Sequence, residues 1–415
     1  MNRRLARLAL LGALALDGCS DDASSAPAEK PHVSRLRVRV AVADLRAPTI
    51  AFYDVADREV VGRLTIDAPV ASLVGSQSGD TALAVPKDGG GVRVLGGGVA
   101  VIPHKDHIHI FKSPPEVLGD PVPGAGAAAS TFADGQWGIF FEGDPAGAGG
   151  AAAALALTEE PWVQGTRVPV DVAAPTPHRG FTIPFGGGYL VSRPQASGGP
   201  VAGGADLVVA GSAPQPLVEC PEMTSAASSG AVVAFACRDG VVLLGPDRVA
   251  GAPVALPDGM KPYELAALAE QPFLLGRDPA GRVFALELAT RVARALPLEG
   301  EACDAVLEIG TTPRGVVLTS AGNVERFALA SDERRTTVAA VPAFACSDPE
   351  RPRLAATPGR AWITSPASGE LLEVDTSAGA TVRRISVGGA PGPIAVLGLA
   401  ARDADLSTGN DKLTD

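Results

Sequence analysis

The chain has 415 residues, of which 46% are hydrophobic, 49 are glycine and 36 are proline. That hydrophobic fraction is ample for a core, and so many turn-forming residues predict short strands and few long helices. The formal net charge of -11 at pH 7 argues against binding to nucleic acid or to an anionic membrane surface, because both require clustered Lys and Arg.

Residues 1–19 have the pattern of a signal peptide. Arginines precede and enter an apolar run at residues 8–16, which is too short to span a bilayer as a helix. The following Leu16-Asp17-Gly18-Cys19 is similar to a bacterial lipobox, in which the cysteine is lipidated, although Asp17 is atypical. Residues 20–37 are polar and are expected to form a flexible tether. We therefore expect an exported, periplasmic protein that touches the membrane only through a lipid on Cys19.

From residue 38 onward, short apolar runs recur between turn-forming residues. The second strand of each predicted unit begins near Val40, Ala82, Trp137, Tyr189, Val232, Phe273, Val316 and Trp362. A period of roughly 40 to 50 residues with about four strands per unit is typical of a β-propeller. These positions predict eight blades, and seven remain an alternative because the spacing in the first half is uneven.

The predicted all-β propeller spans residues 38–401, and the polar residues 402–415 are expected to form a disordered tail. The first strand set, at residues 38–66, lacks an innermost member. The late apolar run at residues 393–399 is expected to supply it, which would close the ring and remove an exposed sheet edge.

Three of the five histidines lie within six residues, at His104, His107 and His109, with Asp106 between them. Neutral imidazole is the commonest protein ligand for zinc. If a strand begins at Ile108, His107 and His109 point to the same face, and Asp106 can ligate or can orient an imidazole. The run therefore predicts a metal site, and the alternative is a solvated polar loop.

A fourth histidine, His178, precedes a predicted inner strand at residues 181–185 and is expected near the ring axis. The alternative is a histidine bonded to a neighbouring carbonyl. Strict alternation of strand direction places the histidine run on the opposite face from His178, which conflicts with a single site made from both. The nearby carboxylates Glu142, Asp144 and Glu222 could complete a site, although their positions are more typical of turns and surfaces.

Apart from Cys19, the chain has four cysteines, and an even number in an exported chain indicates two disulfides. Three pairings can be drawn, and closeness in sequence favours Cys220 with Cys237 and Cys303 with Cys346. The alternatives are buried free thiols or a thiolate metal site, but the chain has no Cys-x-x-Cys.

Three segments carry a resemblance: the run from His104 to His109, Pro177-His178-Arg179-Gly180, and Cys220-Pro221 followed by residues 234–241. Together they resemble the periplasmic zinc metallochaperones of the AztD type. The resemblance implies a β-propeller that binds Zn2+ and passes it to the solute-binding protein of a zinc ABC importer. It also implies a ligand set made of His104, Asp106, His107, His109 and His178.

The chain departs from that family at several positions. Lys105 stands where glycine is more common, and Arg179 where a small residue or another histidine is expected. After Cys220-Pro221 the family tends to have histidine and glutamate, but this chain has Glu222 and Met223. Residues 121–124 also lack a histidine. These departures imply a divergent member with a weaker site, or a propeller that has lost metal transfer.

We do not expect an enzyme, because the chain has no Gly-x-Ser-x-Gly elbow, Walker loop or His-Glu-x-x-His motif. A lactonase-like hydrolase would need converging carboxylates that the sequence does not place. The first hypothesis is a monomeric zinc metallochaperone. The alternative is a lipid-anchored propeller that serves as an interaction scaffold for another envelope protein.

Overall fold

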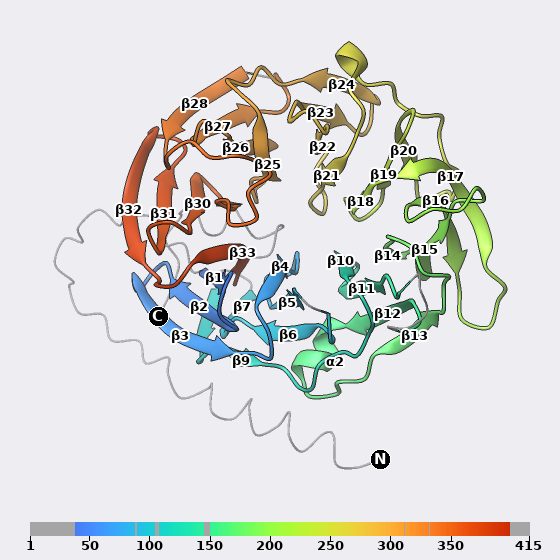
Figure 1. The fold of residues 1–415 in the computed structure, drawn as a ribbon, viewed down its shortest axis with the longest axis horizontal. Helices are drawn as coiled ribbons and strands as arrows, with labels where there is room; N and C mark the ends of the chain where they lie inside the picture. Colours follow the sequence, from blue (N-terminus) through green and yellow to red (C-terminus); the bar gives the residue numbers. More distant parts are fainter. Residues whose placement is uncertain are drawn as a thin grey trace, which may run out of the picture. The chain divides into compact units, whose positions relative to one another are not determined.

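The computed structural model describes residues 38–87, 89–103, 108–144, 150–310, 312–331 and 333–398, without the side chains of residues 101–103, 108–110 and Arg335. These residues form a β-propeller whose eight blades surround one axis (Figure 1). The predicted fold class is confirmed, and so is the blade count of eight.

The first four blades each contain four antiparallel strands. From the axis outward, blade 1 consists of β33 (Pro391–Leu397), β1 (Arg39–Asp44), β2 (Thr49–Asp54) and β3 (Glu59–Thr65). Blade 2 consists of β4 (Val70–Gly75), β5 (Thr81–Pro86), β6 (Arg93–Gly96) and β9 (Glu116–Val117). Blade 3 consists of β10 (Ala128–Ala133), β11 (Gln136–Phe141), β12 (Ala153–Thr158) and β13 (Val170–Ala173). Blade 4 consists of β14 (Thr182–Phe185), β15 (Gly188–Pro194), β16 (Ala202–Val208) and β17 (Gln215–Met223).

The last four blades follow in chain order. Blade 5 consists of β18 (Ser225–Ser228), β19 (Val233–Cys237) and β20 (Gly240–Leu244). Blade 6 consists of β21 (Glu264–Ala266), β22 (Phe273–Arg277), β23 (Val283–Glu287) and β24 (Val292–Ala295). Blade 7 consists of β25 (Ala302–Leu307), β26 (Arg314–Thr319), β27 (Asn323–Ala328) and β28 (Glu333–Ala339). Blade 8 consists of β29 (Leu354–Thr357), β30 (Arg360–Ser365), β31 (Glu370–Asp375) and β32 (Ala380–Ser386).

The core lies between the faces of neighbouring blades. Middle strands such as β5, β19 and β20 are buried along their whole length, because a blade packs against each of their faces. The outer strand β32 is mostly exposed. Buried Trp137 and Trp362 donate their indole N–H groups to the hydroxyls of Thr81 and Thr357, so neither ring leaves an unpaired donor in the core.

The ring is closed by its two ends, as predicted. The last strand β33 pairs antiparallel with β1, with Val396 opposite Val40 and Ala395 opposite Ala41. Leu397 of β33 joins Phe52 in one buried cluster. The inner edge of β1 is therefore covered by β33.

Two predicted strands differ in the structure. The four-stranded repeat predicts a fourth strand in blade 5, and residues 252–256 have the apolar pattern for it. Only isolated bridges occur at residues 250–256, of Val254 with Val241 and of Ala250 with Leu244. Pro253 removes a backbone donor within this segment and Pro257 removes one directly after it, which prevents a regular ladder. A short 3-10 helix, η1 (Pro257–Gly259), follows this segment. In blade 3, a five-residue helix, α2 (Glu159–Val163), directly follows β12.

The second difference is a hairpin inserted into blade 2. A strand does begin at Ile108, but it does not belong to the blade: β7 (Val99–Pro103) and β8 (Ile108–Lys112) pair only with each other. The outer strand of blade 2 is β9, which pairs with β6. The extra length of this repeat is thus a separate two-stranded element between the third and fourth strands.

The two faces of the ring carry different features. All inner strands begin on the same face of the ring. Both disulfides lie on that face, so we name it the disulfide face. β6 runs parallel to the inner strand β4, so the inserted hairpin leaves and rejoins blade 2 on the opposite face, here named the hairpin face. No helix in the described part of the chain has the length and apolarity that crossing a membrane requires.

Both favoured disulfides are present. Cys220 of β17 bonds Cys237 of β19 and joins blades 4 and 5, and Cys303 of β25 bonds Cys346 in the segment that leads to blade 8. Such bonds persist in oxidising compartments, which supports the prediction that the protein is exported.

Candidate metal site

The histidine run lies largely outside the described residues. This holds for His104, Asp106 and His107, and for His109 the structure describes the backbone alone. His109 occupies β8 opposite Ile102, so the strand expected at this histidine is present. The sequence-predicted ligand set of this run remains a prediction.

A buried arginine fixes the base of the hairpin that carries the run. Arg39 at the start of β1 donates through Nη1 to the carbonyl oxygens of Gly97 at 2.7 Å and Ser113 at 2.6 Å, which lie on either side of the hairpin. Gly98 turns here with φ +67°, and a Cβ would come within 2.5 Å of Arg39 Nη1. Only glycine allows this close approach.

A second contact ties the hairpin to blade 1. Lys112 of β8 donates to Asp54 at 3.1 Å and to Asp57 at 2.6 Å, and Arg39 Nε also donates to Asp54 at 3.2 Å. Burial alone raises the pKa of Asp54, but the backbone N–H of Asp57 and the Lys112 ammonium outweigh that effect and hold the pKa below its ordinary value. The sequence carries no local signal for the contacts of Lys112, because Asp54 and Asp57 lie more than fifty residues away from it.

His178 is buried between blades 3 and 4. Its ring packs edge-on against Phe140, with the ring centroids 4.9 Å apart, and is 2% exposed. Nδ1 lies 2.7 Å from the carbonyl oxygen of Thr176, and Nε2 lies 2.9 Å from the hydroxyl of Ser192. This is the alternative raised from the sequence, a histidine bonded to a neighbouring carbonyl.

The hydrogen bonds of His178 fit only one neutral tautomer. A carbonyl oxygen can only accept, so Nδ1 carries the proton, and Nε2 accepts from the Ser192 hydroxyl. The Ser192 oxygen in turn accepts from the N–H of Phe181 at 2.9 Å. Burial lowers the pKa of His178, although its hydrogen bonds oppose that shift. For Nε2 to bind a metal ion, Ser192 would have to release it.

Gly180 explains why this arrangement fits. A Cβ there would lie 2.1 Å from Ser192 Oγ and 2.8 Å from His178 Nε2. The glycine in Pro177-His178-Arg179-Gly180 is therefore required by close packing of the histidine and serine. That glycine is the sequence signal from which a packed histidine could have been predicted.

The described structure does not bring the predicted metal site together. The hairpin base lies on the hairpin face, whereas His178 precedes the inner strand β14 on the disulfide face, as the alternation of strands predicted. Among the residues that the structure describes, no group of three or more His, Cys, Asp or Glu side chains could hold a metal ion.

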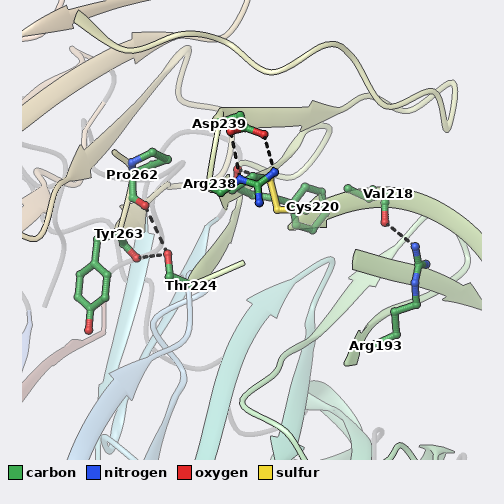
Figure 2. The surroundings of a disulfide bond; sticks show 10 residues. Arg193, Val218, Cys220, Thr224, Arg238, Asp239, Pro262 and Tyr263 are labelled. Carbon is green, nitrogen blue, oxygen red and sulfur yellow. Dashed lines mark hydrogen bonds and ion pairs between the residues drawn. A yellow bond between two sulfur atoms is a disulfide. The ribbon is translucent and has the colours of Figure 1, made fainter. Parts of the chain in front are cut away.

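The other candidate carboxylates lie on the disulfide face. Burial raises the pKa of Glu142, although the charge of Arg179 opposes that shift. Glu222 stands where the AztD type tends to have histidine, adopts a positive φ of 54° and is exposed beside Arg238 at 3.9 Å. Figure 2 shows Arg238 paired with Asp239 next to Cys220, and Thr224 directed at the carbonyl of Tyr263 at 2.9 Å.

A comparison with known proteins finds a relative that aligns with most of the chain. No family model matches the sequence. The zinc chaperone AztD of Citrobacter koseri is 25% identical over 376 residues, which cover 87% of this chain and 86% of that protein. The resemblance to the AztD type is thereby confirmed.

Two solved structures of AztD have the same fold as this chain. The crystal structure of Citrobacter koseri AztD has a TM-score of 0.78 at 22% identity and covers 87% of this chain and 97% of its own. Its apo structure has a TM-score of 0.76 at 21% identity with the same coverage. The dihydro-heme d1 dehydrogenase NirN shares the propeller more distantly, with a TM-score of 0.55 at 11% identity, 91% coverage of this chain and 78% of its own.

Proposed function

We propose that this protein is a zinc metallochaperone that binds Zn2+ outside the cytoplasm and passes it to the solute-binding protein of a zinc ABC importer. The observation that carries the proposal is similarity over 87% of the chain to a protein named a zinc chaperone. His107 and His109 form the core of the zinc site, and His104 and Asp106 supply adjacent ligands or orient the imidazoles. His178 joins them only if the histidine run reaches the channel at the ring axis and Ser192 releases its Nε2.

The chemistry suits a carrier. Zinc has no geometric preference from d-electrons, so a loop of imidazoles and a carboxylate can hold the ion and release it to a better organised acceptor. The acidic net charge of -11 favours attraction of cations, although it adds little specificity.

The proposal includes a membrane tether through a lipid on Cys19, with the propeller held in the periplasm as a monomer. Two disulfides support an oxidising compartment. The lipid is tested by the mass of the mature protein: a chain that starts at Cys19 with no added acyl mass would contradict the tether.

Zinc titration of the purified protein tests the function. We expect stoichiometric binding at micromolar zinc, and we expect the double variant His107→Ala with His109→Ala to abolish it, because two of the imidazole ligands are gone. His32→Ala removes a histidine outside the run and should bind as the wild type does. An unchanged zinc stoichiometry in the double variant would contradict the proposed site.

A second candidate function is an interaction scaffold that has lost metal transfer. The observation that favours it is the internal hydrogen bonding of both His178 nitrogens, together with Glu222 at a position where histidine is expected. In that case the wild-type protein shows no binding at micromolar zinc.

A further inference from the structure

Three arginines gather around the Cys303–Cys346 disulfide. Arg277 at the end of β22 donates to the carbonyl of Ala302 at 3.1 Å, directly before Cys303. Arg351 and Arg353 belong to the segment that follows Cys346 and enters β29, whose Leu354 N–H donates to Asp304 at 3.2 Å. These residues start or end strands on the disulfide face, so their side chains share one end of the ring. We name Arg277, Arg351 and Arg353 the arginine cluster.

The acidic groups nearby are already engaged. Glu264 pairs with Arg277 at 2.7 Å. Asp304 accepts the backbone N–H groups of Ala305 at 3.1 Å and Leu354 at 3.2 Å. Glu350, the neighbour of Arg351 in sequence, turns to Arg46 and accepts from its Nε at 2.8 Å. None of these carboxylates is hydrogen-bonded to Arg351 or Arg353 within the described residues.

Two guanidinium groups are therefore left without acceptors. Nη1 of Arg351 is fully buried, and the described part of the chain offers it no hydrogen-bond partner. The side chain of Arg353 is half-buried and donates no hydrogen bond within the same residues. Its backbone alone is engaged: the N–H donates to the hydroxyl of Thr364, and the carbonyl oxygen accepts from the N–H of Thr364. A buried donor with no acceptor is unfavourable, and proteins normally satisfy it with a ligand or with water.

The charge of the site has a definite sign. Three guanidinium groups against the carboxylates of Glu264 and Asp304 leave one positive charge, which one carboxylate group would balance. Burial and the charge of Arg353 lower the pKa of Arg351, and the charges of Asp304 and Glu264 only partly oppose that shift. Burial raises the pKa of Asp304, which further weakens its ability to neutralise the cluster.

We propose that Arg351 and Arg353 form a binding site for the carboxylate group of an acidic ligand on the disulfide face. The planar guanidinium fork donates two parallel hydrogen bonds to a carboxylate, and a singly charged group matches the single excess charge. Arg277 is not a primary contact, because Glu264 already occupies its fork. The site is independent of the inserted hairpin of β7 and β8, which lies on the hairpin face.

Calorimetric titration of the zinc-free protein in EDTA tests the proposal. Succinate serves as the small-acid probe, an end-blocked glutamate peptide as the protein-segment probe, and inorganic phosphate as the contrast, all at constant ionic strength. We expect at least one carboxylate probe to bind, with phosphate weaker, and Arg351→Gln and Arg353→Gln each to reduce the association constant about tenfold. Tighter binding of succinate assigns a free acid, and tighter binding of the peptide assigns an acidic protein segment.

Matched variants keep the test decisive. Arg58→Gln makes the same change of charge at an exposed arginine far from the cluster and should bind as the wild type does. Arg353→Lys keeps the positive charge but lacks the planar guanidinium group, so we expect its affinity for the carboxylate probe to lie between those of the wild type and Arg353→Gln. This variant still tests the proposal if Arg351→Gln folds poorly. Absence of binding by both carboxylate probes, equal affinity for phosphate, or unchanged affinity in folded Arg351 and Arg353 variants would overturn the assignment. Zinc binding is unaffected by any of these outcomes, so the two proposals fail separately.

Discussion

The buried ring of His178 is hydrogen-bonded at both nitrogens, to the carbonyl oxygen of Thr176 and to the hydroxyl of Ser192. These hydrogen bonds favour the protonated ring, but burial disfavours its charge more strongly, so the pKa of His178 lies below its ordinary value. The folded protein therefore binds fewer protons at this site than the unfolded chain does.

This histidine should make stability depend on pH near neutrality. Because its folded pKa lies below the unfolded value of about 6.5, its contribution is fully present above that pH and is lost as the pH falls through the folded pKa. We expect the free energy of unfolding to fall between pH 7.5 and pH 5.5. His178→Gln should flatten that slope and cost about 1–3 kcal/mol at pH 7.5, because a buried partner is left unpaired. Denaturant titrations at both values measure this, and His32→Gln should keep the wild-type slope. A wild-type slope in His178→Gln would contradict the assignment.

Among single residues, the sequence singled out His178 as a candidate for function but did not decide what its side chain contacts. It raised both a ligand and a carbonyl-bonded role for His178, and the structure shows the second arrangement. The arginine cluster was not predicted. Its members come from the end of β22 in blade 6 and from the segment that enters β29 in blade 8, and no local pattern marks residues that meet only when the ring forms.

At the scale of single elements, apolar periodicity located most strands but not all of their partners. Residues 99–102 and 108–112 have the same composition as strands within a blade, yet they form a hairpin of their own. A strand of blade 2 would have to pair with β6, and β9 forms that pair instead. Similarly, residues 252–256 have an apolar pattern, but Pro253 within them and Pro257 directly after them prevent a ladder. Periodicity reports which residues are buried, and the register of pairing depends on distant contacts.

The inserted hairpin should open more readily when its ammonium contact is removed. Lys112→Gln deletes the charged bonds to Asp54 and Asp57, and we expect amide exchange in residues 99–103 and 108–112 to quicken about 5–30-fold, equivalent to about 1–2 kcal/mol. Lys261→Gln, at an exposed lysine with no side-chain hydrogen bond in the described part of the chain, serves as the control. Because the folded pKa of Asp54 is depressed, this anchoring is present above about pH 3.9 and weakens as the pH falls through the folded value. Equal exchange rates in Lys112→Gln and the wild type would refute the anchoring role.

At the scale of the whole molecule, the ring depends on one strand that arrives last. The sequence predicted this closure from a first strand set that lacked its innermost member. β33 supplies that member and covers the edge of β1, while Ile394, Ala395 and Leu397 complete buried clusters in blade 1. Such a closure couples the two ends of the chain, so the stability of the first blade is tied to residues about 350 positions away.

Truncation before β33 should therefore destabilise the entire propeller. A chain ending at Ala390 loses the burial of Ile394 and Leu397, about 4 kcal/mol at about 2 kcal/mol for each side chain, in addition to the ladder with β1. We expect the thermal midpoint to fall by about 8 °C or more and the exposed edge of β1 to promote aggregation. A chain ending at Arg402 keeps β33 and removes only the polar residues predicted to form a tail, so its midpoint should match that of the full chain. Scanning calorimetry with light scattering compares the two. If both truncations unfold at the wild-type temperature without aggregation, the pairing of β33 with β1 does not support the ring.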